Sequence, residues 1–597
     1  TGEVRISGGT GGISTTSIRQ NTIQASFGIS IAENTQPLTV EHNTITAAAT
    51  GVFVRDASNV LIQSNKIQHP YASAQSGITI LYNSTNNTLQ ENTIEYGPTT
   101  LESEEYSGIF IVGDDTIQPS YTTLTKNNIQ LTAPLSALRI LSAHHTTMQD
   151  NTLQRITTEK SPPLITITSA LNTLFTGTNT ITTNNGKGFS ITGRTINDYN
   201  VTIIGELLNN GQPLNYYYAP EEHVALEKEH VSVLYIVGAK TTTINDVTAE
   251  EGMNFIGVNT INISATTTNG PITVTPTFKE VKSNQQTGIL LTETTTIQDS
   301  NVNSSEIAGI YLEGTKHTNI IGTTIHTTKE AFYGGVQYHD ATEKVPLQDG
   351  KVQEKKYSSE TLHITNTTIL AGPTTEGIII NTIGAPNITI TNTTLQSSIE
   401  EEQLTTGIAH QTNGGNLHVE NTNIQNADTG IFSGQHYSDD PRPLEHITIL
   451  NTTMNSVSSG TYILSPYTHL NIAHNTINAQ DTGINIPSTT QQQATTYIIE
   501  KNNITTKHYS ATGIALIPNS ENAIVKDNTI TTQKDRSYGM IIQLPTNQQV
   551  RGTTTITGND IQLNGNGIPD PLSQEFITGN AYSPTTQLSG ATGILLL

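Results

Sequence analysis

Residues 470–486 read LNIAHNTINAQDTGINI and contain both halves of a phrase that recurs along the whole chain. The first half, Leu470 to Ile477, has the pattern hydrophobic-x-hydrophobic-x-x-Asn-x-Ile. The second half, Gly483 to Ile486, is a Gly-Ile strand start. The first half also occurs at 38–45 and 60–67, and the second at 28–31, 77–80, 108–111, 377–380 and 593–596. The phrase therefore sets the architecture of the entire chain.

The spacing of this phrase predicts stacked coils. Gly-Ile starts between Gly28 and Gly108 lie 23, 26 and 31 residues apart, and a period of about 20 to 50 residues is typical of a solenoid. Apolar and polar residues alternate within each phrase, as they do in β-strands. We therefore predict an all-β fold, a right-handed parallel β-helix (solenoid) of about 20 coils with a few loop insertions. At about 4.8 Å per coil, the rod is on the order of 100 Å long.

The recurrent Asn of the phrase is expected at a turn between two strands. Its short side chain tolerates left-handed backbone and hydrogen-bonds nearby backbone groups. Because the coils stack, these Asn side chains should form a hydrogen-bonded ladder from coil to coil.

Three segments interrupt the rhythm without ending it. We expect one continuous solenoid, with coils over 1–204, an insertion over 205–231 and further coils over 232–597. Loop insertions are expected near 337–360 and 564–583. Insertions on one face of a solenoid are common binding places, although a tolerated surface excursion is the more ordinary interpretation.

Composition excludes several classes of function. The net charge is -23, and the 27 Lys and Arg residues are too few and too scattered for a nucleic-acid footprint. The chain has no Cys, which excludes disulfides, thiolate metal sites and a cysteine nucleophile. No transmembrane run or signal peptide is visible, so this segment is not expected to insert in a membrane. Since Thr1 is not an initiator Met and both ends read as strands, we expect a piece of a longer chain.

Two acidic pairs are the nearest approach to catalytic carboxylates, Asp114-Asp115 and Asp439-Asp440. Paired carboxylates can hold a metal or divide acid and base roles. Adjacent residues on a strand, however, point to opposite faces, and Asp residues near Gly and Pro are usually turn residues. No catalytic residue is therefore assigned.

Histidines offer a weaker metal hypothesis. His144 and His145 are adjacent, so they should not converge on one ion. His410, His418, His436 and His446 fall within less than two coils and could line up by stacking, and imidazoles so arranged suit copper or zinc. No ligand spacing is fixed, so no metal ligand and no cofactor is assigned; calcium has no motif to support it.

Asn-x-Ser/Thr sequons are glycan acceptors in a secreted protein, although a chain this rich in Asn and Thr contains some by chance. The candidates are Asn83, Asn86, Asn200, Asn262, Asn303, Asn366, Asn387, Asn392, Asn451 and Asn503. Asn366 and Asn392 occupy the same place in the phrase one coil apart, about 5 Å from each other. We predict that the two are not both fully glycosylated, and intact-peptide mass spectrometry tests this.

The Gly-Ile strand and the Asn-x-Ile turn resemble the repeat shared by pectate lyases, polygalacturonases, alginate epimerases and phage tailspikes. The stretch 208–218, LNNGQPLNYYY, followed by a return to coils, resembles the NosD-like or carbohydrate-binding and sugar-hydrolase type of β-helix. That resemblance implies an archaeal cell-surface or surface-layer setting. It does not imply an activity, because one fold hosts many functions, and the Asn-Thr-Asp, Arg-x-Lys and Asp-Pro-His phrases of the related enzymes are not found.

The leading hypothesis is an extracellular structural or adhesive surface glycoprotein, a subunit of a surface layer, sheath or filament that associates with itself. Apolar strand edges at both ends of the sequence would favour head-to-tail contacts. The alternatives are a polysaccharide-active enzyme (lyase, hydrolase or epimerase) and a viral tailspike-type fibre that binds glycans. The lack of a recognisable catalytic motif favours a non-enzymatic function.

Overall fold

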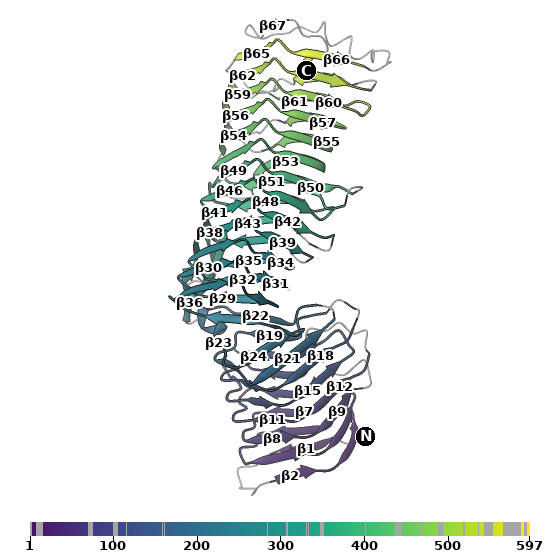
Figure 1. The fold of residues 1–597 in the computed structure, drawn as a ribbon, viewed down its shortest axis with the longest axis vertical. Coiled ribbons are helices and arrows are strands. Elements are labelled where there is room, and N and C mark those ends of the chain that lie inside the picture. Colours follow the sequence, from purple (N-terminus) through teal and green to yellow (C-terminus); the bar gives the residue numbers. More distant parts are fainter. Residues whose placement is uncertain are drawn as a thin grey trace.

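A computed structural model gives the fold (Figure 1). It describes residues 3–7, 16–69, 76–98, 106–114, 116–157, 159, 161–184, 186–282, 285–305, 308–329, 331, 333–346, 352–399, 402–435, 444–464, 467–487, 494–517, 520–534, 537–542, 553–564, 587–589 and 594–596. The strands form two stacked solenoid segments, β1 to β25 and β26 to β68, which together make one elongated molecule (Figure 1).

The N-terminal segment has three parallel sheets, and each coil contributes one strand to each sheet. The first sheet contains β1 (Val4–Ser7), β4 (Ile29–Ala32), β7 (Thr50–Arg55), β10 (Ser76–Leu81), β13 (Ser107–Val112), β16 (Ser136–Leu141), β19 (Ile165–Thr168) and β22 (Phe189–Thr192). The second contains β2 (Thr16–Arg19), β5 (Leu38–Glu41), β8 (Val60–Gln63), β11 (Thr88–Gln90), β14 (Thr123–Thr125), β17 (Thr147–Gln149), β20 (Thr173–Thr176) and β23 (Val201–Ile203). The third contains β3 (Thr22–Ala25), β6 (Thr44–Ala47), β9 (Lys66–His69), β12 (Thr93–Tyr96), β15 (Asn128–Leu131), β18 (Thr152–Arg155), β21 (Thr178–Thr183), β24 (Glu206–Asn209) and the short antiparallel β25 (Gln212–Pro213).

The C-terminal segment has a narrow sheet of 14 strands and a broad sheet of 25 strands. The narrow sheet contains β27 (His223–Glu227), β30 (Thr241–Asn245), β33 (Thr260–Ser264), β38 (Thr292–Gln298), β41 (Thr315–Ile321), β46 (Thr361–Thr365), β49 (Asn387–Thr391), β52 (Asn416–Glu420), β54 (Leu444–Leu450), β56 (Tyr467–Ala473), β59 (Ala494–Glu500), β62 (Ser520–Lys526), β65 (Thr553–Thr557) and β67 (Gln587–Ser589).

The broad sheet bends around the rest of each coil. Its strands are β26 (Asn215–Tyr218), β28 (His230–Val231), β29 (Leu234–Val237), β31 (Thr248–Ala249), β32 (Met253–Ile256), β34 (Thr267–Thr268), β35 (Ile272–Thr275), β39 (Asn301–Ser304), β40 (Ile310–Glu313), β42 (Thr324–Thr327), β43 (Val336–His339), β47 (Thr368–Ala371), β48 (Glu376–Thr382), β50 (Thr394–Ser397), β51 (Leu404–Thr412), β53 (Asn423–Gln435), β55 (Thr453–Ile463), β57 (Thr476–Ala479), β58 (Thr482–Ile486), β60 (Asn503–Thr506), β61 (Thr512–Leu516), β63 (Thr529–Thr532), β64 (Tyr538–Ile542), β66 (Asp560–Leu563) and β68 (Ile594–Leu596). The size of the sheets agrees with the expectation of about 20 coils.

The alternation in the sequence places every second side chain in the core. In β8, Val60 and Ile62 are buried, while Leu61 and Gln63 are only partly covered. The chain then turns at Ser64, whose φ is 53°. Equivalent corner residues with positive φ recur from coil to coil, and in most coils the residue that follows the corner is buried, as Asn43 and Asn65 are.

That buried residue forms the predicted ladder. In the N-terminal segment the Nδ2 of each Asn donates to the Oδ1 of the next Asn at 3.0–3.1 Å, through Asn21, Asn43, Asn65, Asn92, Asn127, Asn151 and Asn179. A second ladder links Asn475, Asn502, Asn528 and Asn559 at 2.9 Å. Between the two, hydroxyls take the same place and donate to the carbonyl two residues earlier, in Thr367, Thr393, Thr422 and Thr452. The Asn-ladder prediction is therefore confirmed, with a threonine variant in the middle of the rod.

The glycines of the Gly-Ile phrase lie where two coils approach closely. A Cβ on any of them would lie 2.3–2.6 Å from the carbonyl oxygen of the matching residue in the next coil; this holds for Gly28, Gly51, Gly77, Gly108, Gly377, Gly407, Gly430, Gly460, Gly483 and Gly513. Since none of these ten has positive φ, the requirement is one of space and not of backbone conformation.

The interval 205–231 contains strands β24 to β28 and the step between the two segments (Figure 1). After β22, a single 3-10 turn, η1 (Ile196–Tyr199), and β23 to β25 end the three-sheet stack. In β29, Leu234 and Ile236 point into the C-terminal core, whereas Tyr235 and Val237 pack on the N-terminal core. A strand that is buried on both faces reads as a continuous apolar run, which explains the sequence of 233–237.

Two antiparallel hairpins leave the C-terminal segment. The first pairs β36 (Thr277–Lys282) with β37 (Gln285–Leu290) and contacts η1 of the N-terminal segment. The second pairs β44 (Ala341–Pro346) with β45 (Val352–Tyr357) and occupies most of the predicted insertion at 337–360. Apart from Asn564, the predicted insertion at 564–583 lies outside the described residues.

Candidate functional site

One row of polar side chains follows the outer face of the third sheet. Thr46, Gln68, Glu95 and Gln130 pair in register on β6, β9, β12 and β15. A cavity of about 500 Å³ opens at this row. Its lining residues are Thr46, Gln68, His69, Glu95, Tyr96, Gly97, Gln130 and Thr132.

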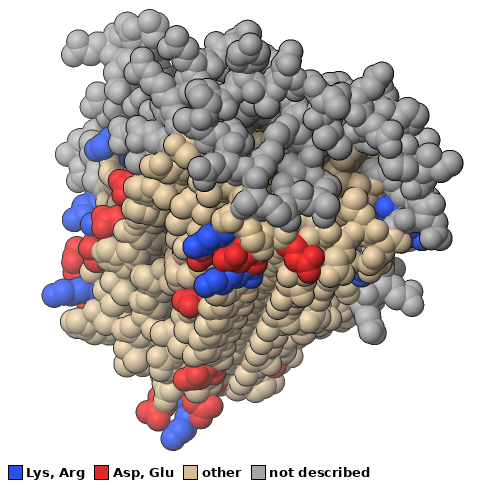
Figure 2. Space-filling model, turned by 90° about the horizontal axis from the view of Figure 1, so that it is seen from above, with Lys and Arg blue, Asp and Glu red and all other residues tan. Residues whose placement is uncertain are grey.

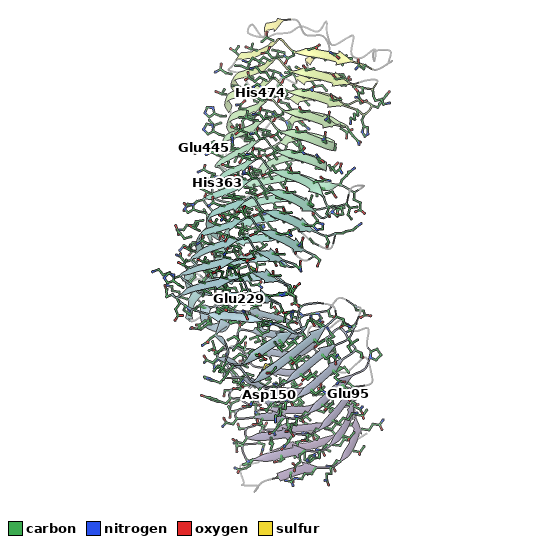
Figure 3. All side chains as sticks on the ribbon, viewed as in Figure 1. Glu95, Asp150, Glu229, His363, Glu445 and His474 are labelled. Atoms are coloured by element: carbon green, nitrogen blue, oxygen red, sulfur yellow. The ribbon has the colours of Figure 1, made fainter. Side chains whose placement is uncertain are left out.

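Glu95 is the centre of the polar contacts at this cavity, and Figure 3 shows it on the flank of the N-terminal segment. The Nε2 of Gln68 donates to its carboxylate at 2.7 Å, and the Nζ of Lys66 lies 3.2 Å from it. Both partners come from β9, one coil away. Fixed amide and carboxylate groups of this kind are what a site for hydroxyl-bearing ligands needs, since they offer donors and acceptors in one plane.

His69 and Tyr96 form the buried end of the site. Their rings stack at 4.5 Å, and both are nearly inaccessible to solvent. The Nδ1 of His69 lies 3.0 Å from the carbonyl oxygen of Ala47 and must donate to it. Burial lowers the pKa of His69 to about 4, so the ring is neutral near pH 7 and its Nε2, which has no partner, is a hydrogen-bond acceptor.

The chemistry open to this arrangement is binding more than proton transfer. The Tyr96 hydroxyl donates to the Ser107 carbonyl at 3.0 Å, and burial raises the pKa of Tyr96 well above its usual value. Glu95 is the one carboxylate among the lining residues. A pair of carboxylates that could divide acid and base roles is not found among them.

Sequence reasoning did not single out any of these cavity residues. The sequence does contain a pattern that marks the polar row: its members each follow the Ile of an Asn-x-Ile phrase, and they are Thr46, Gln68, Glu95 and Gln130. A coil-by-coil alignment would have found the row, but not that His69 and Tyr96 stack beneath it.

Of the two acidic pairs predicted as the nearest approach to catalytic carboxylates, the structure describes only Asp114. The Oδ1 of Asp114 accepts hydrogen bonds from Thr116 and from the backbone N–H of Ile117, and the Thr116 hydroxyl is the main reason that the pKa of Asp114 is lowered. Asp114 is thus a turn residue, as its neighbours indicated. Asp115, Asp439 and Asp440 lie outside the described residues.

The proposed alignment of four histidines is wrong for His410. That side chain is completely buried in the core on β51, between Ser433 and Thr412, because its position on the strand faces inward. His418 and His446 do lie on the outer face of the narrow sheet, on β52 and β54, whereas His436 lies outside the described residues. The rings of His144 and His145 are nearly perpendicular and 6.4 Å apart, so they do not converge.

The sequon residues lie at the surface or close to it. Asn83, Asn86, Asn366, Asn387, Asn392, Asn451 and Asn503 are exposed, and Asn200, Asn262 and Asn303 are half-buried. Thr365 pairs with Thr391, so Asn366 and Asn392 follow at matching corners of successive coils. The coil alignment behind the crowding prediction is therefore confirmed, and the glycan occupancy stays a prediction.

Among the residues that the structure describes, no group of three or more His, Cys, Asp or Glu side chains is placed to hold a metal ion. Likewise, none of the described segments is a helix of the length and apolarity needed to cross a membrane.

Comparisons with known proteins agree with the architecture. The family described as right handed beta helix region matches residues 27–219, which cover most of the N-terminal segment and β26. The predicted fold class, an all-β right-handed parallel β-helix, is thus confirmed. No curated protein matches the chain.

Two solved structures are similar to this chain over most of its length. One is the PL6 family alginate lyase AlyGC, with 10% identity and a TM-score of 0.18 over 94% of this chain and 100% of that one. The other is a mutant of the same enzyme, with 11% identity and a TM-score of 0.19 over 94% of this chain and 97% of that one. At these values the likeness carries no information about activity.

Proposed function

We propose that this protein is an extracellular structural or adhesive rod, a subunit of a cell-surface layer, sheath or filament that associates with copies of itself. The observation that carries the proposal is the rod itself: parallel pairing continues coil after coil within each segment, and β26 to β29 join the two segments. A solenoid of this kind presents long regular surfaces and has little need of a single deep site.

The outer surface supports the same proposal. Along the broad sheet one outward row is made of Thr and Asn in register, namely Thr324, Thr368, Thr394, Asn423, Thr453, Thr476, Asn503 and Thr529. On the part of the surface that Figure 2 shows, charged side chains gather in small groups, with uncharged stretches between them. Uncharged hydrogen-bonding groups repeated about every 4.8 Å suit lateral contact with another regular surface.

Electron microscopy of native material tests the proposal. A filament, sheath or lattice with a repeat that matches the rod is the expected result. Light scattering at rising protein concentration is the companion measurement in solution. Free rods by microscopy, together with a monomer at the highest concentration reached, would count against self-association.

A second candidate function is the binding or cleavage of a polysaccharide, and the cavity at Glu95 is the observation that favours it. A panel of neutral and acidic glycans would be screened for binding and, by ultraviolet absorbance, for release of unsaturated uronates. Gln68→Ala and Glu95→Ala should weaken binding, whereas Gln154→Ala, further along the same row, should not. Equal binding by all three variants would exclude the cavity as the site.

A further inference from the structure

The outer face of the narrow sheet brings together two histidines that are far from each other in sequence. His446 on β54 pairs in register with Asn416 on β52 and with His469 on β56. All three side chains belong to one outward row and succeed one another at the coil spacing of about 4.8 Å.

The two imidazole rings face each other. Their centroids are 4.7 Å apart and their planes differ by 10°. His446 is exposed and His469 is half-buried. Other histidines on this face differ: His418 lies 3.2 Å from Glu420, and His363 has Asn319 and Thr389 as its neighbours in register.

Two amide oxygens beside the pair lack a partner. The Nδ2 of Asn416 donates to the Oδ1 of Asn387 at 2.6 Å, toward the preceding coil. The Oδ1 of Asn416 is buried and accepts no hydrogen bond. The same is true of the Oδ1 of Asn471, which lies on the same face of β56, two residues after His469. A buried carbonyl oxygen without a donor is unusual in a folded protein and needs an explanation.

We propose that His446 and His469 bind one divalent first-row transition metal ion, Cu²⁺, Ni²⁺ or Zn²⁺, and that the Oδ1 atoms of Asn416 and Asn471 accept hydrogen bonds from water molecules on that ion. Imidazole nitrogen is a preferred ligand for these three ions. Because both side chains are at the surface, rotation about χ2 brings one nitrogen of each ring to a common ion at about 2.0–2.1 Å. Water completes the coordination.

The local charge favours a cation. Glu445, which precedes His446, is exposed, and Figure 3 shows it on the same flank of the molecule as His363. The protein as a whole carries a net charge of -23. This site does not depend on the proposed surface function.

Isothermal titration of the full chain with each metal salt tests the inference. The expected result is one site per chain that is filled before the other histidines. The double variant His446→Gln/His469→Gln should lose that site, with affinity down by at least about tenfold. The matched control is His363→Gln, a single histidine on the same sheet face, which should bind as the native protein does.

Electron paramagnetic resonance of the Cu²⁺-loaded protein supplies a second readout. Coupling to two imidazole nitrogens is expected in the native chain and should disappear in the double variant. Circular dichroism would show that each variant is folded. Unchanged affinity in the double variant, or an equal loss in the His363 control, would overturn the site. Unchanged affinity in Asn416→Thr/Asn471→Thr would overturn the role of the two amide oxygens alone.

Discussion

Buried amides in a solenoid must find all their partners within the stack. Asn92 shows how: its Nδ2 donates to the Ile62 carbonyl at 2.8 Å and to Asn127 at 3.0 Å, and its Oδ1 accepts from the backbone and side chain of Asn65. A fully satisfied polar chain of this kind rigidifies the core and fixes the register between coils. The Asn of the sequence phrase is therefore a structural residue in every coil that contains it.

The first prediction concerns Asn92. In Asn92→Ala, the backbone N–H of Asn65 loses its acceptor, and the Asn65 side chain and the Ile62 carbonyl each lose one hydrogen bond. Each buried group left unpaired costs about 1–3 kcal/mol. Hydrogen exchange should become faster in the coils around residues 62–65, because repeat proteins open locally. Asn92→Thr is the matched control: Thr occupies this place in the middle of the rod, so its effect should be smaller. Equal protection in all three proteins would contradict the prediction.

The second prediction concerns pH. Burial lowers the pKa of His410 to about 3, compared with about 6.5 in an unfolded chain. Between these values the unfolded chain binds more protons, so the free energy of unfolding should fall as the pH falls from 6.5 toward 3, by up to about 1.4 kcal/mol per pH unit. This loss should be absent above pH 6.5.

The variant His410→Gln removes the contribution of His410 to the pH dependence of the free energy of unfolding. Urea unfolding at pH 7, 5 and 4 should show a weaker pH dependence in the variant, whatever its stability at pH 7. Some dependence should remain because burial also lowers the pKa of His69 to about 4. Parallel curves for the two proteins would assign the acid sensitivity to other groups.

At the scale of the element, the strand that follows each Gly-Ile start is held tightly against the next coil. For Gly483, an added Cβ would lie 2.3 Å from a methyl group of Ile504 and 2.5 Å from the Gly513 carbonyl oxygen. The oxygen belongs to paired backbone and cannot move without disturbing the ladder. The glycine row therefore sets how closely the coils stack along the rod.

A third prediction follows from this contact. Gly483→Ala should lower the free energy of unfolding by about 1–3 kcal/mol, as overpacking does in other cores. Denaturant unfolding followed by circular dichroism would measure it. Asn485→Ala, on the outward face of the same strand, should change stability by much less. Wild-type stability for Gly483→Ala would mean that the coils can separate locally.

The repeated phrase predicts the strands and turns of a coil, but it does not predict which side chains form the candidate sites. The Asn-x-Ile phrase was enough to predict strand, turn and inward face for residues such as Ile67 and Asn65. His410 was misplaced because its residue type suggested a surface ligand, although it alternates with Ile408 and Thr412 on the inward face of β51. The pair His446 and His469 was missed because the coils differ in length, so sequence separation alone does not give the register.

At the scale of the whole molecule, aromatic rings and one carboxylate form the contact between the N-terminal and C-terminal segments. Tyr216 and Tyr235 pack against Phe189 with ring centroids 6.4 and 5.5 Å apart. Glu251 accepts hydrogen bonds from the Asn209 side chain at 2.6 Å and from the Gly188 backbone at 3.3 Å. The flank of the C-terminal segment thus covers the end of the N-terminal core.

The fourth prediction tests this junction. Glu251→Ala leaves the fully buried Asn209 without its acceptor, so the junction should weaken by about 1–3 kcal/mol. Hydrogen exchange at Gly188 and limited proteolysis near the junction should both become faster. Glu250→Ala is the matched control, because the Glu250 side chain is 40% exposed and contacts His230 and Asn269 at the surface, where such pairs contribute little. If the two variants behave alike, Glu251 does not hold the segments together.

The sequence by itself determined the repeating unit of this protein: strands that alternate, a Gly-Ile strand start, and a turn Asn that forms a ladder in the coils that contain it. These are local requirements, and each is met within one coil and its neighbour. Only the tertiary structure decided which side chains meet across coils, such as Glu95 with Gln68 and His446 with His469. It also decided that the rod has a step at residues 205–231. Both depend on register and on loop lengths that vary from coil to coil, and no single phrase of the sequence records them.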